Sequence, residues 1–162
     1  MSLALICGQG RLPRIVSDAQ DRRPLVAVLS GFEPEGLTPD ITFHLETLGT
    51  LLNDLKAKGV TQACLCGAIR RPPIDPGRLD AATAPLVPRL QEALTSGDDG
   101  ALRIVMALFE EAGFQIASVD DLVPDLLPKP GVLTLKTYTP QNTVEARLGE
   151  RTVAAMGFLT PG

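Results

Sequence analysis

The sequence predicts an α/β domain with a mostly parallel sheet and helices on both of its faces. Short apolar runs alternate with segments of helical periodicity about four times along the chain, which is typical of such sheets. Apolar residues make up 44% of the chain and aromatic residues only 4%, which indicates an aliphatic core. Aliphatic cores are typical of parallel sheets that helices cover. A glycine-containing turn also joins the first apolar run to the first helical segment.

Each predicted element follows from its own residues. The runs 3–7, 24–29 and 60–66 are short, apolar and bounded by turn residues, as buried strands are. The helix 47–58 has leucines at helical spacing and ends in lysines and a glycine. The proline-rich segment 67–88 predicts an irregular connection, although its last residues begin a helix. The other predicted strands are 41–45 and 114–119, and the other predicted helices are 13–21, 86–94, 100–112 and 143–156.

Composition limits the classes of function. A net charge of −4 gives no general attraction to nucleic acid, so we expect no nucleic-acid partner. The three cysteines show no framework spacing. Cys64 and Cys66 would share one face of a strand, where two buried thiols are favoured over a disulfide or a zinc site. This pattern predicts a reducing, cytosolic compartment. Neither a signal peptide nor a membrane-spanning run is recognisable.

The turn Gly8-Gln9-Gly10 follows the first predicted strand and leads into a helix. Backbone N–H groups at such a turn favour a phosphate, and a simple tight turn is the alternative. Two departures weaken a dinucleotide-binding interpretation. Pro13 stands where a third small residue is usual, and the second strand is followed by Ser30 and Gly31 instead of an acidic residue, with Glu33 only later.

Basic side chains follow two of the predicted strands. Arg11 comes directly after the first turn, and Arg70 and Arg71 follow Gly67 at the end of the strand 60–66. Because the carboxyl ends of parallel strands meet at one edge, we expect these residues to lie there together. Paired guanidinium groups can hold phosphate oxygens, and a solvated pair or a salt bridge to acidic loops is the alternative.

Two other groups of residues have both a functional and a structural interpretation. Asp98 and Asp99 could bind Mg²⁺, but their position before the helix 100–112 is explained fully by capping. His44 is the only histidine and has no nucleophile motif beside it, so a structural histidine is favoured over a general base.

Four motifs occur in one order along nearly the whole chain, at residues 5–13, 67–73, 97–99 and 122–127. In these motifs the chain resembles the N-terminal domain of the two-domain UDP-2,3-diacylglucosamine pyrophosphatases of lipid A biosynthesis. The resemblance implies a Rossmann-like, three-layer domain over residues 1–157. It also implies that a linker to a second, catalytic domain, absent from this chain, begins at 158–162.

The same resemblance implies the chemistry. The family hydrolyses UDP-2,3-diacylglucosamine to 2,3-diacylglucosamine 1-phosphate (lipid X) and UMP, by attack of water on the α-phosphorus with a divalent metal, usually Mg²⁺. The main acidic residue belongs to the second domain, so we predict that this chain is the ligand-binding half and is inactive alone. The predicted metal ligands are Asp98 and Asp99, and the predicted substrate-binding residues are Gly8, Gln9, Gly10, Arg11, Gly67, Arg70 and Arg71.

The expected partners are UDP-diacylglucosamine or lipid X and the missing C-terminal domain, and a homodimer is left open. The amphiphilic substrate places the enzyme in the cytoplasm, peripheral to the inner membrane, with membrane contact through apolar loops. Two other functions remain as alternatives. One is a NAD(P)-binding oxidoreductase domain, and the other is a non-catalytic interaction domain.

Overall fold

The computed structural model describes residues 2–70, 74–128, 131–132 and 135–159, with side chains as far as residue 156. The chain divides into two compact units, Met1–Pro124 and Asp125–Gly162. The first unit contains the sheet and the helices that cover it. The second contains the helix α6 (Pro140–Leu159), which begins before and ends after the predicted helix 143–156.

Five parallel strands form one sheet in the order β3-β2-β1-β4-β5. The strands β2 and β3 are added in turn on one side of β1. The order then reverses, because β4 pairs with the other side of β1 and β5 follows it. In open α/β sheets such a reversal opens a crevice at the carboxyl ends of the two central strands. The strand bounds are Leu3–Cys7 (β1), Leu25–Leu29 (β2), Ile41–Phe43 (β3), Gln62–Cys66 (β4) and Gln115–Ile116 (β5).

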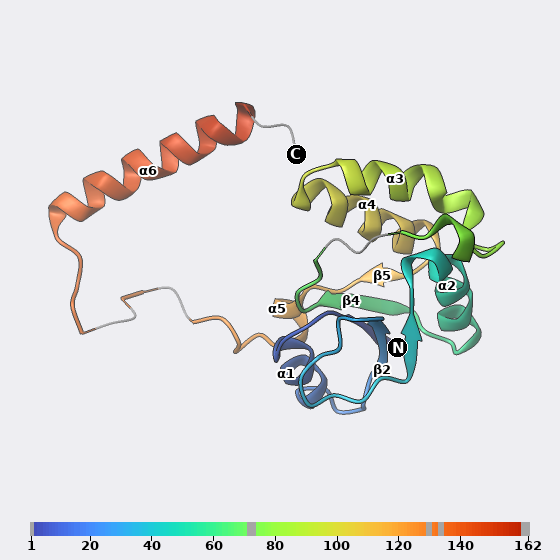
Figure 1. Ribbon diagram of the computed structural model, residues 1–162. Helices are drawn as coiled ribbons and strands as arrows, with labels where there is room; N and C mark the ends of the chain where they lie inside the picture. The colour runs from blue at the N-terminus through green and yellow to red at the C-terminus, as the bar shows by residue number, and fades with distance from the viewer. Residues whose placement is uncertain (1, 71–73, 129–130, 133–134, 160–162) are drawn as a thin grey trace. The chain divides into compact units, whose positions relative to one another are not determined.

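Helices cover both faces of the sheet, so the predicted three-layer α/β architecture is confirmed (Figure 1). The helix α1 (Leu12–Asp18) buries Val16 on one face, in a core with alternate residues of β1, β2 and β4. The helices α2 (Leu48–Ala57), α3 (Val87–Thr95) and α4 (Asp98–Glu111) lie on the other face. There Phe109 of α4 is fully buried and packs against Phe114, with 5.9 Å between the centroids of the two rings.

Some element ends differ from the sequence prediction. The strand predicted at 114–119 is reduced to β5, because Ser118 begins a new helix, α5 (Val119–Leu122), by accepting a hydrogen bond from the Asp121 N–H at 3.2 Å. The helix α4 starts at Asp98 with Gly97 as its N-cap. Asp98 and Asp99 were expected to precede the helix as caps; they form its first turn instead.

The described part of the first unit also contains three short 3₁₀ segments: η1 (Leu45–Thr47), η2 (Pro76–Arg78) and η3 (Ala84–Leu86). The last two lie in the proline-rich connection after β4, which is irregular as predicted. No helix within the described ranges combines the length and apolarity that crossing a bilayer requires. The predicted domain boundary near residue 157 stays a prediction.

Candidate functional site

The turns after β1 and β4 are bonded to each other at the carboxyl edge of the sheet. The Gly8 N–H donates to the Cys66 carbonyl at 2.9 Å. Gln9 and Ala68 then form an antiparallel bridge, in which each N–H donates to the other residue's carbonyl at 2.8 and 2.9 Å. Two predicted substrate-binding turns are therefore joined into one structure at the point where the strand order reverses.

This pairing explains two of the glycines. A Cβ on Gly8 would lie 2.5 Å from the Ala68 carbonyl oxygen, and one on Gly67 would lie 2.5 Å from the Gly8 carbonyl oxygen. Gly10 has a positive φ of +98°, as Gly67 has, but it differs because no atom lies within 4 Å of where its Cβ would be. The Gly8 and Gln9 N–H groups are used by the pairing, so the N–H groups of Gly10 and Arg11 are the ones left for a ligand in this turn.

The loop between β2 and β3 packs against the same turn. The Glu35 N–H donates to the Gly10 carbonyl at 3.1 Å, and Arg14 Nη1 donates to the Gly36 carbonyl at 2.8 Å. The Gln9 side chain extends to the Gly31 carbonyl, with Nε2 at 3.4 Å from the oxygen. Three loops, after β1, β2 and β4, thus meet at one end of the sheet.

Arg11 and Arg70 are exposed at this edge. Neither side chain has a hydrogen bond or an ion pair with any part of the chain that the structure describes. Arg14 and Arg103, by contrast, are held by carboxylates, with Arg14 Nε 2.8 Å from Asp18 Oδ2. Arg71, the third predicted arginine, lies outside the described residues. Two guanidinium groups are thus available to an anion near the paired turns.

The connection that follows Arg70 is fastened to the start of α2. Glu46 is 5% exposed, and its Oε1 accepts a hydrogen bond from the Asp75 N–H at 2.7 Å. Asp80 accepts from Thr50 Oγ1 and from the Thr83 N–H. Burial alone would raise the pKa of Glu46, but hydrogen bonds from the Asp75 and Glu46 N–H groups and the charge of Arg78 hold it below its usual value.

The two predicted metal ligands lie at the N-terminus of α4, on the side of the carboxyl edge because α4 runs back to the start of β5. Asp99 Oδ2 is bound to Arg103 Nε at 2.7 Å, one turn along the same helix. Within the described residues, no group of three histidine, cysteine or acidic side chains is placed to hold a metal ion. Mg²⁺ is commonly bound by one or two carboxylates together with water and substrate phosphates, so Asp98 and Asp99 stay predicted ligands.

His44 follows β3 at the same edge. Its Nε2 lies 3.1 Å from Arg78 Nη2, and because a guanidinium only donates, Nε2 is the accepting nitrogen. Its backbone N–H and carbonyl both bond to Thr47 Oγ1, at 3.2 and 3.1 Å. These contacts give His44 a structural role at the start of η1.

The cysteines are core residues, as predicted. Cys7, Cys64 and Cys66 are all buried and free. A hydrogen bond with Cys66, together with burial, raises the pKa of the Cys64 thiol. For Cys66 the hydrogen bond with Cys64 lowers the pKa, but the one with Cys7 and burial outweigh it and bring the pKa to about 12. Thiols held neutral in this way are poor nucleophiles and poor metal ligands.

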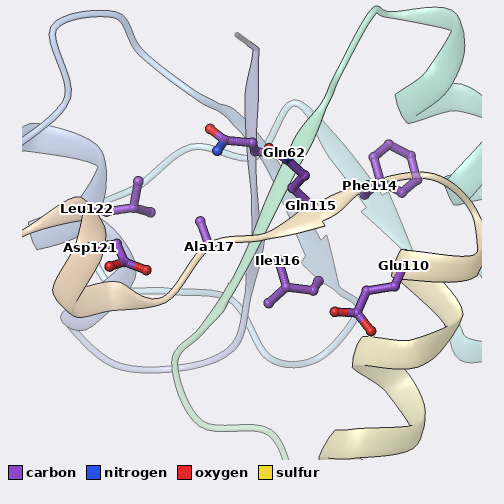
Figure 2. A pocket seen from close by; sticks show the side chains of 8 residues that line it. All are labelled: Gln62, Glu110, Phe114, Gln115, Ile116, Ala117, Asp121 and Leu122. Carbon is purple, nitrogen blue, oxygen red and sulfur yellow. The ribbon is translucent and has the colours of Figure 1, made fainter.

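An open hollow of about 690 Å³ lies elsewhere, along the free edge of β5 (Figure 2). Glu110 extends into it from α4, and Asp121 and Leu122 come from α5 on the other side (Figure 2). None of the predicted substrate-binding residues lines it, and its two carboxylates would repel a phosphate. We therefore place the candidate site at the paired turns.

Sequence reasoning missed two carboxylates at this edge. Glu33 stands four residues after β2, so the sequence does not predict it at the strand end, yet its Oε1 accepts a hydrogen bond from the Gly31 N–H at 2.9 Å and so returns there. Gly31, two residues earlier, is the sequence signal for this return, because glycine readily adopts its φ of +85°. Glu46 carries no sequence signal, because its buried bond to Asp75 joins residues far apart in the chain.

The parallel sheet, its reversal beside β1 and the polar turns at that point define a doubly wound α/β domain. Residues 2–126 match the family model described as the LpxI N-terminal domain, and the chain belongs to this family.

A curated relative is the UDP-2,3-diacylglucosamine pyrophosphatase LpxI of Caulobacter vibrioides. The two are 28% identical over 148 residues, which cover 88% of this chain and 53% of the relative. The chain therefore spans about half the length of the curated relative that it matches.

Proposed function

We propose that this chain is the substrate-binding part of an enzyme that hydrolyses UDP-2,3-diacylglucosamine to lipid X and UMP. The observation that carries the proposal is the family match over residues 2–126. The name of the Caulobacter relative supplies the reaction, and that relative is about twice as long as the matched region. We assign the catalytic acid to a second part of the longer enzyme. Family membership also favours this function over the oxidoreductase alternative.

In the proposed reaction, water attacks the α-phosphorus. A bond forms between the water oxygen and that phosphorus, and the bond to the bridging oxygen breaks. The electron pair leaves with the β-phosphate of lipid X, and the water proton passes to a base outside this chain. The role of this chain is to hold the charged phosphates through the Gly10 and Arg11 N–H groups and the guanidinium groups of Arg11, Arg70 and Arg71.

We keep Asp98 and Asp99 as proposed Mg²⁺ ligands of the longer enzyme, whose other residues and substrate phosphates would complete the coordination. The exposed ion pair of Asp99 with Arg103 would open when the metal binds. The substrate carries acyl chains, so we propose work at the cytoplasmic face of the inner membrane. Contact there would be apolar, since a chain of net charge −4 is not attracted to anionic lipid.

The decisive experiment measures UMP release from UDP-2,3-diacylglucosamine by the 162-residue chain, with and without Mg²⁺. The expected result is no release above the uncatalysed rate, while the Caulobacter relative releases UMP and the chain still binds UMP in calorimetry. Turnover by the chain alone would contradict the proposed division of labour. Tight binding of NADH without binding of UMP would favour the oxidoreductase alternative.

A further inference from the structure

The end of β2 carries an unexpected carboxylate. After Leu29 the chain turns sharply: the Phe32 N–H donates to the Leu29 carbonyl at 2.9 Å, and Gly31 takes a positive φ. This turn brings the exposed Glu33 side chain back, so that Oε1 accepts from the Gly31 N–H. The Gly31 and Glu33 N–H groups lower the pKa of Glu33, so its carboxylate is charged at neutral pH. A negative charge thus stands at the carboxyl end of the strand next to β1.

A second polar side chain reaches the same turn from the neighbouring loop. Gln9 Nε2 donates to the Gly31 carbonyl, so a carboxamide and a carboxylate flank one glycine. No atom lies within 4 Å of where a Cβ on Gly31 would be, which leaves that side of the turn open. Beyond the Gly31 and Glu33 N–H groups, no hydrogen-bond donor to the Glu33 carboxylate is found in the described parts of the chain.

We propose that Glu33, assisted by Gln9, binds the 2′- and 3′-hydroxyls of the ribose of the uridine nucleotide. In doubly wound sheets an acidic residue at the end of the second strand accepts hydrogen bonds from ribose hydroxyls. Glu33 follows β2 and Arg11 follows β1, so the carboxylate and the guanidinium group belong to the ends of neighbouring strands. This inference rests on the proposed function, and it adds the part of the substrate that this loop recognises.

The chemistry of the proposed substrate selects the ribose over the other sugar. A vicinal pair of hydroxyls suits one carboxylate, because both can donate to it. In a 2,3-diacylglucosamine the substituents at positions 2 and 3 are acylated, so no vicinal pair remains free on that ring. The ribose keeps both hydroxyls, and it is therefore the sugar that this carboxylate can recognise.

The test compares binding of UMP, 2′-deoxy-UMP and inorganic pyrophosphate to the full chain by titration calorimetry. Wild type should bind UMP about tenfold more tightly than 2′-deoxy-UMP, the effect of one charge-assisted hydrogen bond. Glu33→Gln keeps the shape of the side chain and an acceptor for the Gly31 N–H. It should weaken UMP binding about tenfold and bring the two nucleotides close to equal affinity, with pyrophosphate binding unchanged.

Glu35→Gln is the matched control, because Glu35 is an exposed carboxylate in the same loop and bonds to Gly10 only through its backbone N–H. It should leave the ratio of UMP to 2′-deoxy-UMP affinity unchanged. An equal ratio in wild type and Glu33→Gln overturns the role of Glu33 and leaves the proposed function standing. Failure of wild type to bind either UMP or pyrophosphate overturns both. Thermal unfolding of each variant verifies that the fold is retained.

Discussion

Four glycines at the carboxyl edge fall into two pairs that differ in their surroundings. Gly8 and Gly67 lie so close to each other's turns that a side chain on either would meet a backbone carbonyl. Gly10 and Gly31 have positive φ angles but face open space. The first pair is required for the two turns to meet, whereas the second leaves backbone exposed where a ligand could approach. One glycine-rich edge thus serves the fold and the candidate site through different residues.

The largest effect should come from filling the crowded side. Gly67→Ala places a methyl group against the Gly8 carbonyl and keeps a φ of +93°, so the free energy of unfolding should fall by about 3 kcal/mol. Gly8→Ala introduces the clash without the positive φ. Gly10→Ala introduces only the strain of a positive φ, so it should lower the free energy of unfolding by about 1 kcal/mol. Urea denaturation of the three variants would give the ranking, and equal losses would refute the distinction.

A smaller loss of stability should follow when the hydrogen bond that holds the segment after Arg70 is removed. Glu46→Ala leaves the Asp75 N–H without its buried acceptor and should cost about 2 kcal/mol at neutral pH. The pKa of Glu46 lies below its usual 4.5, so the ionised form stabilises the fold and this contribution is lost as the pH falls through the folded pKa.

Glu46→Gln keeps the acceptor but removes the charge, which isolates the part that titrates. In urea denaturation series, the free energy of unfolding of Glu46→Gln should therefore be lower than that of wild type at pH 7. This difference should shrink toward about pH 3. A deficit that grows on acidification would show that the charge of Glu46 does not stabilise the folded chain.

The smallest effect on the fold should come from the open side. Arg11→Ala and Arg70→Ala remove side chains without partners in the described chain, so stability should change by less than about 0.5 kcal/mol. Each should nevertheless weaken UMP and pyrophosphate binding about tenfold, because a charge-assisted phosphate contact is lost. Arg89→Ala is the control, since Arg89 of α3 is bound to Glu111 of α4 and takes no part in the paired turns. Equal weakening in all three variants would point to a diffuse charge effect.

The architecture could be predicted from the sequence because its signals are local. The apolar runs of β1, β2 and β4 and the leucine spacing of α2 each lie within a few residues. The site depends on contacts between distant residues, such as the bridge of Gln9 with Ala68 and the bond of Glu46 to Asp75. Periodicity carries no information on such pairs. The position of Glu33 could not be predicted, because its return to β2 depends on one backbone angle at Gly31.

The bridge between Gln9 and Ala68 has a consequence for how a ligand would be received. The two turns lose their conformational freedom when the central strands assemble, before any ligand arrives. Association at this edge would then need little further ordering of the backbone, which favours tighter binding for the same set of contacts. Separating the turns, in contrast, would require breaking the pairing of β1 with β4. The two turns are therefore held rigid by the central strands of the sheet.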